Sequence, residues 1–211
     1  MGDLPANYFQ RYDEAQDERF YEQPRLVTHI DEGAIAAVTQ LYREFFPPDG
    51  AILDLMSSWV SHLPPEVTYR RVVGVGMNAV ELAANERLHE RIVLNLNRTP
   101  SLPFGDGEFD GAGICVSVQY LTQPVAAFRE IGRVLRPAAP LVVSFSNRCF
   151  PTKAVAVWQA LDDHGHGQLV QRYFRDAGNW TDIQFLDRSS RRRSGDPLFA
   201  VVGRSAGPVS P

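Results

Sequence analysis

The stretch Ala51–Pro65 (AILDLMSSWVSHLPP) combines residue types and spacing that suit ligand binding. It begins as an apolar run whose one charge is Asp54, and it then changes abruptly to the hydroxyl residues Ser57 and Ser58. This layout is typical of a buried strand that turns into a helix, where backbone N–H groups and the helix N-terminus face a nucleotide-like ligand. The turn contains no glycine, so its Cβ atoms would crowd a ligand that approaches bare backbone. The two closing prolines limit the helix to Ser58–Leu63.

A cluster of acidic and histidine side chains stands at residues 162–166 (DDHGH). Carboxylates and imidazoles bind divalent metals, but the sequence shows no second cluster of ligands, and Asp162 with His164 also fits the end of a helix. Cys115 and Cys149 lack the Cys-x-x-Cys or Cys/His spacing of a metal site. We therefore predict no metal centre, and Cys115, inside an apolar run, is interpreted as a core residue.

The composition predicts a globular protein of one domain, with at most a small added piece. The chain has 211 residues, 44% hydrophobic and 22% charged, and a formal net charge of −4. This charge argues against nucleic acid as the main partner, because neutralising phosphates requires a basic face. The basic run Arg191–Arg193 is interpreted as a solvated loop between strands. Neither a membrane span nor a signal peptide is visible, so we expect no membrane association and a cytoplasmic location.

Helical patterns come first, and apolar strands alternate with helical connections from residue 51 onward. The expected N-terminal helices are Asp13–Tyr21 and Gly33–Phe46, the second with one apolar face. The expected strands are Ala51–Met56, Arg71–Val75, Arg91–Leu96, Phe109–Val118, Leu141–Phe145, Thr181–Leu186 and Leu198–Val202. The expected later helices are Val125–Leu135 with Thr122 as its N-cap, Pro151–Ala160, and Gln168–Ala177 closed by Gly178.

This order of elements predicts an α/β fold with a doubly wound, mostly parallel seven-stranded sheet, because each crossover must be right-handed and covered. The last two strands lack a helix-length spacer and should pair antiparallel as a final hairpin. The predicted organisation is an N-terminal helical segment at 1–48, the sheet domain at 49–204 and a flexible tail at 205–211.

Two local motifs carry a resemblance to a known family. Leu102–Asp110 (LPFGDGEFD) precedes the fourth expected strand, and Arg133–Ser144 (RVLRPAAPLVVS) leads into the fifth. Together, and at this spacing, they resemble the small-molecule branch of the class I S-adenosylmethionine-dependent methyltransferases over roughly residues 50 to 203. The resemblance implies a Rossmann-like sheet, S-adenosyl-L-methionine as cofactor, and methyl transfer to a small-molecule acceptor.

In this family the cofactor binds at the carboxyl ends of the first four strands. Carried over by position, the resemblance implies a cofactor site made of Asp54, Met56, Ser57 and Ser58 at the first turn, Gly76, Met77 and Asn78 at the second strand, Asn95, Leu96 and Asn97 at the third, and Ser117 and Val118 at the fourth.

The chain departs from the family pattern at two of these places. The first turn lacks the glycines of G-x-G-x-G, and Gly76 stands where the family has an acid that binds both ribose hydroxyls. Asn78 or Glu81 could replace that acid, although Asn78 equally fits an N-cap of the helix at 79–84. An amide oxygen of Asn95 or Asn97 could accept from the adenine amino group.

The resemblance also implies where the methyl acceptor binds. Methyl transfer depends mostly on positioning, and it needs a base only if the acceptor must first lose a proton. Tyr120 and His29 are the candidates for such chemistry, each with packing as the alternative role. The expected acceptor-binding residues are Asn147, Arg148 and Cys149 in the turn after the fifth strand, with Arg148 holding an anionic acceptor, and Tyr21 and Arg25 in an N-terminal lid.

Two rival functions follow from the departures. A non-catalytic protein could keep this fold, lose the cofactor and serve as a binding or regulatory partner, which leaves a homodimer or a protein partner open. A nicotinamide oxidoreductase fits less well, because G-x-G-x-x-G is absent and the final hairpin is foreign to that fold.

Overall fold

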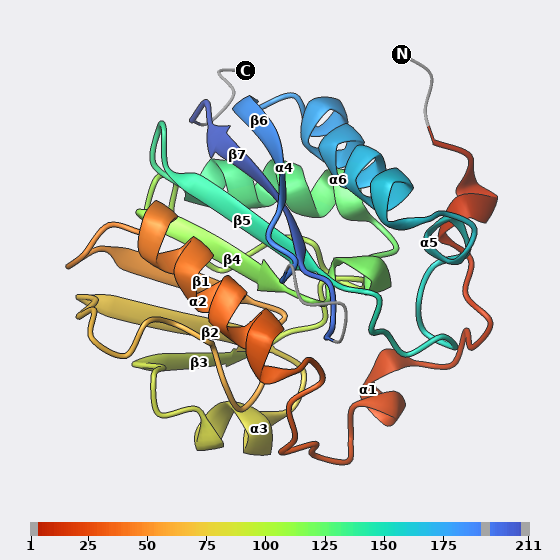
Figure 1. Cartoon of the computed structure of the whole chain (residues 1–211), viewed down its shortest axis with the longest axis horizontal. Coiled ribbons are helices and arrows are strands. Elements are labelled where there is room, and N and C mark those ends of the chain that lie inside the picture. The colour runs from red at the N-terminus through yellow and green to blue at the C-terminus, as the bar shows by residue number, and fades with distance from the viewer. Residues whose placement is uncertain (1–3, 191–194, 208–211) are drawn as a thin grey trace.

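The computed structural model describes residues 4–190 and 195–207. Within them, seven strands form one sheet in the order β3-β2-β1-β4-β5-β7-β6 (Figure 1). The strands are β1 (Ala51–Leu55), β2 (Arg71–Gly76), β3 (Glu90–Val93), β4 (Gly111–Cys115), β5 (Pro140–Phe145), β6 (Trp180–Asp187) and β7 (Phe199–Ser205). β1 to β5 are parallel, and β7 pairs antiparallel with both β5 and β6. The predicted mostly parallel sheet with a final antiparallel hairpin is confirmed.

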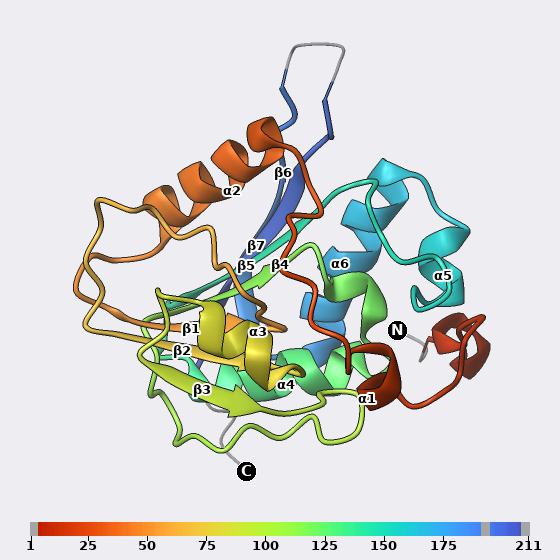
Figure 2. The same cartoon turned by 90° about the horizontal axis from the view of Figure 1, so that it is seen from below.

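Helices cover both faces of the sheet (Figures 1 and 2). The helices are η1 (Ala6–Phe9), α1 (Asp17–Phe20), α2 (Glu32–Phe45), α3 (Ala79–Ala84), η2 (Val118–Tyr120), α4 (Pro124–Val134), α5 (Ala156–Gln159) and α6 (Asp163–Ala177). α2 packs on one face, where a Cβ at Gly113 of β4 would lie 2.8 Å from the Tyr42 hydroxyl oxygen. α4 and α6 pack on the other face, with the Phe128 and Phe174 rings 4.8 Å apart. None of the described helices combines the length and apolarity needed to cross a membrane.

Several local expectations were wrong. The helix expected over Ser58–Leu63 does not form, and His62 within it adopts a left-handed backbone angle (φ 51) that a right-handed helix cannot contain. Thr122 does not cap α4, which begins with Pro124 at its first position and has no side-chain cap. The helix expected over Pro151–Ala160 shortens to α5.

The ends of β4 and of the sheet domain differ from the expected ones. β4 stops at Cys115, three residues before the expected end, and η2 follows. Ser205, assigned to the flexible tail, is the last residue of β7 and is buried. The basic run at 191–193 and the tail at 208–211 lie outside the described residues.

Candidate functional site

A cavity of about 270 Å³ opens at the carboxyl ends of the parallel strands, where the order of the sheet reverses between β1 and β4. Its walls come from the turn after β1, the ends of β2, β3 and β4, and the segment after β5. The N-terminal segment at residues 11–31, here termed the strap, covers it and contributes α1, which Figures 1 and 2 show beside these strand ends.

Most residues expected in the site line this cavity. They are Tyr21, Arg25, His29, Met56, Ser57, Ser58, Gly76, Met77, Asn78, Asn95, Leu96, Asn97, Ser117, Tyr120, Arg148 and Cys149. Asp54, Val118 and Asn147 do not line it. The cavity therefore brings together residues from both ends of the chain, while their individual roles stay predictions.

Asp54 lies under the first turn and holds it in place. Its Oδ2 accepts hydrogen bonds from the Ser57 and Ser61 hydroxyls, both at 2.6 Å. Ser61 Oγ also accepts from Asn85 Nδ2 at 2.8 Å. Burial raises the pKa of Asp54 to about 6, although the two hydroxyl bonds favour its ionised form. Asp54 thus acts on the cavity through the turn.

The turn reaches its shape without glycine. Met56 adopts the left-handed conformation (φ 53) that glycine usually supplies in such a turn. Ser57 N–H then donates to Val75 O at 2.8 Å, which brings the turn against the end of β2.

Gly76 is required by the same contact. A Cβ at position 76 would lie 2.2 Å from Ser57 O, which real structures do not tolerate. No acidic side chain could stand at this position unless the turn moved. The missing acid at the end of β2 therefore has a physical cause, the packing of the turn after β1 onto that strand end.

Asn78 is the N-cap of α3, as its alternative interpretation predicted. Its Oδ1 accepts from the backbone N–H groups of Val80 and Glu81, at 2.9 and 3.1 Å. Its Nδ2 donates to the backbone oxygens of Tyr21 and Glu22 in the strap, at 2.8 and 3.1 Å. The amide that could replace the ribose-binding acid already has these four partners.

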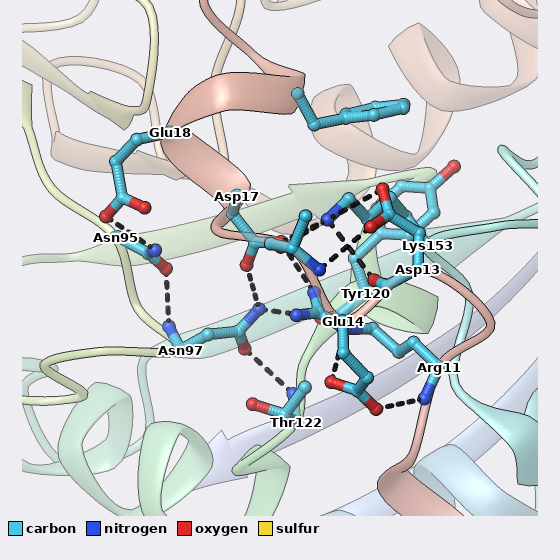
Figure 3. Close-up of polar contacts among 12 residues, drawn as sticks. Arg11, Asp13, Glu14, Asp17, Glu18, Asn95, Asn97, Tyr120, Thr122 and Lys153 are labelled. Atoms are coloured by element: carbon cyan, nitrogen blue, oxygen red, sulfur yellow. Dashed lines mark hydrogen bonds and ion pairs between the residues drawn. The ribbon is translucent and has the colours of Figure 1, made fainter.

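Asn95 and Asn97 also hold the strap (Figure 3). Asn97 Nδ2 donates to Asp17 Oδ2 at 3.0 Å and to Tyr120 O at 2.9 Å, and its Oδ1 accepts from Thr122 N–H at 2.8 Å. Asn95 Nδ2 donates to Glu18 Oε1 at 3.0 Å. The amides expected to meet adenine are engaged within the protein, so the expected bond to adenine stays a prediction.

A buried group of charges fastens the strap at its other side (Figure 3). Lys153 is fully buried, and its Nζ donates to Ala15 O at 2.7 Å and lies 3.1 Å from Asp13 Oδ2 and 3.3 Å from Asp17 Oδ1. Arg11 Nη1 adds a 2.7 Å bond to the same oxygen of Asp17. Paired charges of this kind are expensive to separate, so the strap is held firmly.

Aromatic rings line the part of the cavity nearest β4 and β5. Tyr120 stacks on Phe150 at 5.9 Å, and its hydroxyl accepts from Phe150 N–H at 2.8 Å. Burial raises the pKa of Tyr120. The pKa of His29 is lowered, first by burial and then by the positive charge of Arg25. Tyr120 is therefore a poor base, and His29 is neutral at pH 7.

The two arginines expected near the acceptor differ in their surroundings. Arg148 is 61% exposed, and its Nε bonds Asp196 Oδ1 at 2.7 Å. Arg25 is partly buried, and its guanidinium carbon lies 4.6 Å from the centre of the Phe20 ring. An anionic ligand would therefore have to compete with Asp196 for Arg148.

The sequence interpretation missed several residues of the wall. They are Arg11, Asp17, Val75, Leu94, Cys115, Val116, Leu121 and Phe150. Glu81, considered only as a substitute acid, accepts from Ser58 Oγ at 2.9 Å and from Arg25 N–H at 2.7 Å. Asp17 meets Asn97 across 80 positions in the chain, a pairing that no local spacing could indicate.

Comparison with known proteins agrees with this geometry. Residues 56–143 match the model of a methyltransferase domain family. The ubiquinone/menaquinone biosynthesis C-methyltransferase of Roseobacter denitrificans is 32% identical over 108 residues, which are 51% of this chain and 42% of that protein. The chain thus spans less than half the length of this curated relative.

Solved structures share the fold at low identity. The [4+2]-cyclase SpnF is 17% identical, with a TM-score of 0.62 and 92% of both chains covered. The putative methyltransferase complexed with the Haloferax volcanii Trm112 activator is 15% identical, with a TM-score of 0.60 over 82% of this chain and 90% of that one. Haemonchus contortus phosphoethanolamine N-methyltransferase 2, solved with S-adenosyl-L-methionine, is 12% identical, with a TM-score of 0.58 over 81% of this chain and 52% of that one. The chain therefore has the fold of the class I S-adenosylmethionine-dependent methyltransferases, and its residues 56–143 are similar to a methyltransferase domain family.

Proposed function

We propose that the protein is an S-adenosylmethionine-dependent methyltransferase that acts on a small molecule. The observation that carries the proposal is the strap-covered cavity at the switch point of the sheet, lined from the turn after β1 and the ends of β2, β3 and β4. The matched methyltransferase domain over residues 56–143 supports the same activity.

The residues of the cavity fit this cofactor in shape and polarity. Met56 gives the first turn its glycine-like backbone, and Gly76 leaves the end of β2 without a side chain. Leu94, Leu96 and Leu121 provide an apolar wall near the end of β3, suited to a purine ring. When bound, the cofactor supplies an electrophilic methyl group.

The chain contributes positioning and exclusion of water. The strap closes over the cavity, and the amides and buried charges described above hold it there. Tyr120 keeps its proton, and the lowered pKa of His29 makes it a weak base, so the chain is better suited to orienting an acceptor than to ionising it. The aromatic wall at Tyr120 and Phe150 suits a small apolar or aromatic acceptor.

Calorimetry with S-adenosylhomocysteine tests the proposal. We expect saturable binding with one site, and a Ser117→Trp variant, which fills the cavity wall, should abolish it while melting as a folded protein. Thr181→Trp, an exposed change on β6, is the matched control and should bind normally. Absence of heat at millimolar ligand with the folded wild-type protein would refute the proposal.

One observation favours a second candidate, a non-catalytic protein of this fold. Asn78, Asn95 and Asn97 bond the strap, so a cofactor that needs these amides must displace it. A fold also does not determine an activity, as the shared fold of a [4+2]-cyclase illustrates. This candidate predicts a negative result in the calorimetric experiment.

A further inference from the structure

Arg25 is a charged residue of the cavity wall that has no acidic partner among the residues that the structure describes. Its backbone N–H donates to Glu81 Oε1 at 2.7 Å, and its Nη2 donates to Phe20 O at 2.9 Å. Within the described part of the chain, no carboxylate lies within 4.0 Å of its guanidinium, and Nη1 is buried without a hydrogen-bond partner. By contrast, Arg11 and Arg148, which also line the cavity, pair with Asp17 and Asp196.

The surroundings of Arg25 make an unpaired cation unfavourable. Its guanidinium carbon lies 4.6 Å from the ring centre of Phe20, 5.3 Å from that of Phe150 and 5.8 Å from that of Tyr21. Aromatic faces attract a cation, but they replace only part of the water that it loses. A guanidinium with a buried donor nitrogen that lacks a partner is matched best by an anion that binds in the cavity.

The lack of a strong base points to the same kind of ligand. Tyr120 accepts its hydrogen bond from Phe150 N–H and keeps its own proton, and His29 packs its ring 5.2 Å from the centre of Phe150. The raised pKa of Tyr120 keeps it protonated and the lowered pKa of His29 makes it a weak base, so neither group readily ionises a weakly acidic acceptor. An acceptor that arrives already ionised needs no base, and the positive charge of Arg25 would hold it.

We propose that Arg25 selects the methyl acceptor by binding an anionic group, a carboxylate or an ionised acidic hydroxyl, on an aromatic small molecule. The rings of Phe20, Tyr21 and Phe150 around the guanidinium provide apolar contacts for the aromatic part. This inference deepens the proposed function and rests on it. It also moves the anion-binding role expected of Arg148 to Arg25.

Binding of benzoate and of benzamide, its neutral analogue of nearly equal shape, tests the inference. Calorimetry on the full chain saturated with S-adenosylhomocysteine should show benzoate binding at least about tenfold tighter than benzamide, the difference expected for one charge-assisted pair. Arg25→Met should abolish this preference, and Arg25→Lys should retain part of it. Arg43→Met removes a charge on α2, away from the cavity lining, and should leave the preference intact.

Three results would overturn the inference. Equal affinity for the two probes in the wild-type protein is one, and binding of neither at millimolar concentration is another. The third concerns the carboxylate of the cofactor. If Arg25→Met weakens the binding of S-adenosylhomocysteine but not that of 5′-deoxy-5′-methylthioadenosine, which lacks the amino-acid end, then Arg25 binds the carboxylate of the cofactor instead of the acceptor.

The same experiment separates this inference from the proposed function. If S-adenosylhomocysteine binds and the benzoate preference is absent, the proposed function stands and the role of Arg25 falls. If S-adenosylhomocysteine does not bind, the proposed function falls, and the benzoate and benzamide titrations repeated on the protein alone still decide whether Arg25 binds an anion. Thermal melts of each variant confirm that loss of binding is not loss of folding.

Discussion

Met56 holds a backbone conformation that non-glycine residues rarely adopt, with φ 53, and it does so at the wall of the cavity. The left-handed region disfavours a side chain branched at Cβ more than an unbranched one, because the branch meets the neighbouring carbonyl. Isoleucine and leucine have the same composition but differ in where the side chain branches. Met56→Ile should therefore lower the free energy of unfolding by about 1 kcal/mol more than Met56→Leu does. Urea denaturation measures the difference, and equal stabilities would contradict the assigned strain.

Gly76 offers a sharper test of the packed turn. Gly76→Ala places a Cβ 2.2 Å from Ser57 O, so we expect a loss of about 3 kcal/mol in unfolding free energy and loss of S-adenosylhomocysteine binding. Gly105→Ala is the control, because its nearest contact is an ordinary 3.7 Å, and its effect should be within about 0.5 kcal/mol. A Gly76→Ala protein as stable as this control would mean that the turn moves freely.

Asp54 should make stability depend on pH in an unusual direction. Its folded pKa is about 6, above the ordinary value of 3.8, so the folded state binds the proton more tightly than the unfolded state. The contribution of Asp54 is therefore fully present below pH 3.8 and is lost as the pH rises through 6. Between pH 7 and pH 5 the wild-type protein should gain about 1 kcal/mol relative to Asp54→Asn.

Urea denaturation of both proteins at pH 7 and pH 5 measures this difference. Groups common to both proteins, such as the histidines, cancel in the comparison. A difference that does not change with pH would show that Asp54 is already ionised at pH 5.

The strap covers the carboxyl ends of the parallel strands and so forms one wall of the cavity. The amides of Asn78, Asn95 and Asn97 bond it. The largely buried group of Lys153, Asp13, Asp17 and Arg11 fastens it as well, and Figure 3 shows this group together with Asn95 and Asn97. Its hydrogen bonds are spread along its length, from Arg11 to Asp31, so access to the cavity depends on how firmly these contacts hold.

Lys153→Met should release the strap, because it leaves two carboxylates without their buried cation. Trypsin cleavage after Arg19 and Arg25 should then become at least about tenfold faster than in the wild-type protein. Arg188→Met removes a more exposed ion pair, with Glu44, far from the strap in the chain, and it should leave cleavage after Arg19 and Arg25 unchanged. Unchanged cleavage in Lys153→Met would show that the amides alone hold the strap.

At the scale of the whole molecule, ligand binding should stabilise the closed form. S-adenosylhomocysteine at 100 times its dissociation constant should stabilise the fold by about 2.7 kcal/mol and raise the melting temperature by roughly 5–10 °C. Hydrogen exchange should slow in the strap as well as at the strand ends. Protection of the strand ends with faster exchange in the strap would instead favour displacement of the strap by the ligand.

Much of the architecture could be predicted from local pattern. The apolar strands with helical connections determined a doubly wound sheet, and the short connection between β6 and β7 required an antiparallel hairpin. Local pattern was less reliable between β1 and β2, where the helix expected over Ser58–Leu63 does not form and His62 has a left-handed backbone. Backbone conformation at single positions depends on contacts that lie far away in the chain.

The sequence by itself indicated at which strand ends a site would lie, because parallel strands bring their carboxyl ends to one edge. The motifs at 102–110 and 133–144 carry the resemblance to a family that binds its cofactor there. Only the tertiary structure decided what the side chains at that edge do. The amides of Asn78, Asn95 and Asn97 bond strap residues that lie 57 to 80 positions away in the chain. Position 76 carries glycine because a Cβ there would collide with the carbonyl oxygen of Ser57. Likewise, Arg148 has Asp196 as its partner, whereas Arg25 has no acidic partner within residues 4–190 and 195–207, a difference set by long-range packing. Spacing in a sequence reports neighbours along an element, whereas the charge and hydrogen-bond balance of a cavity depends on groups that folding brings together.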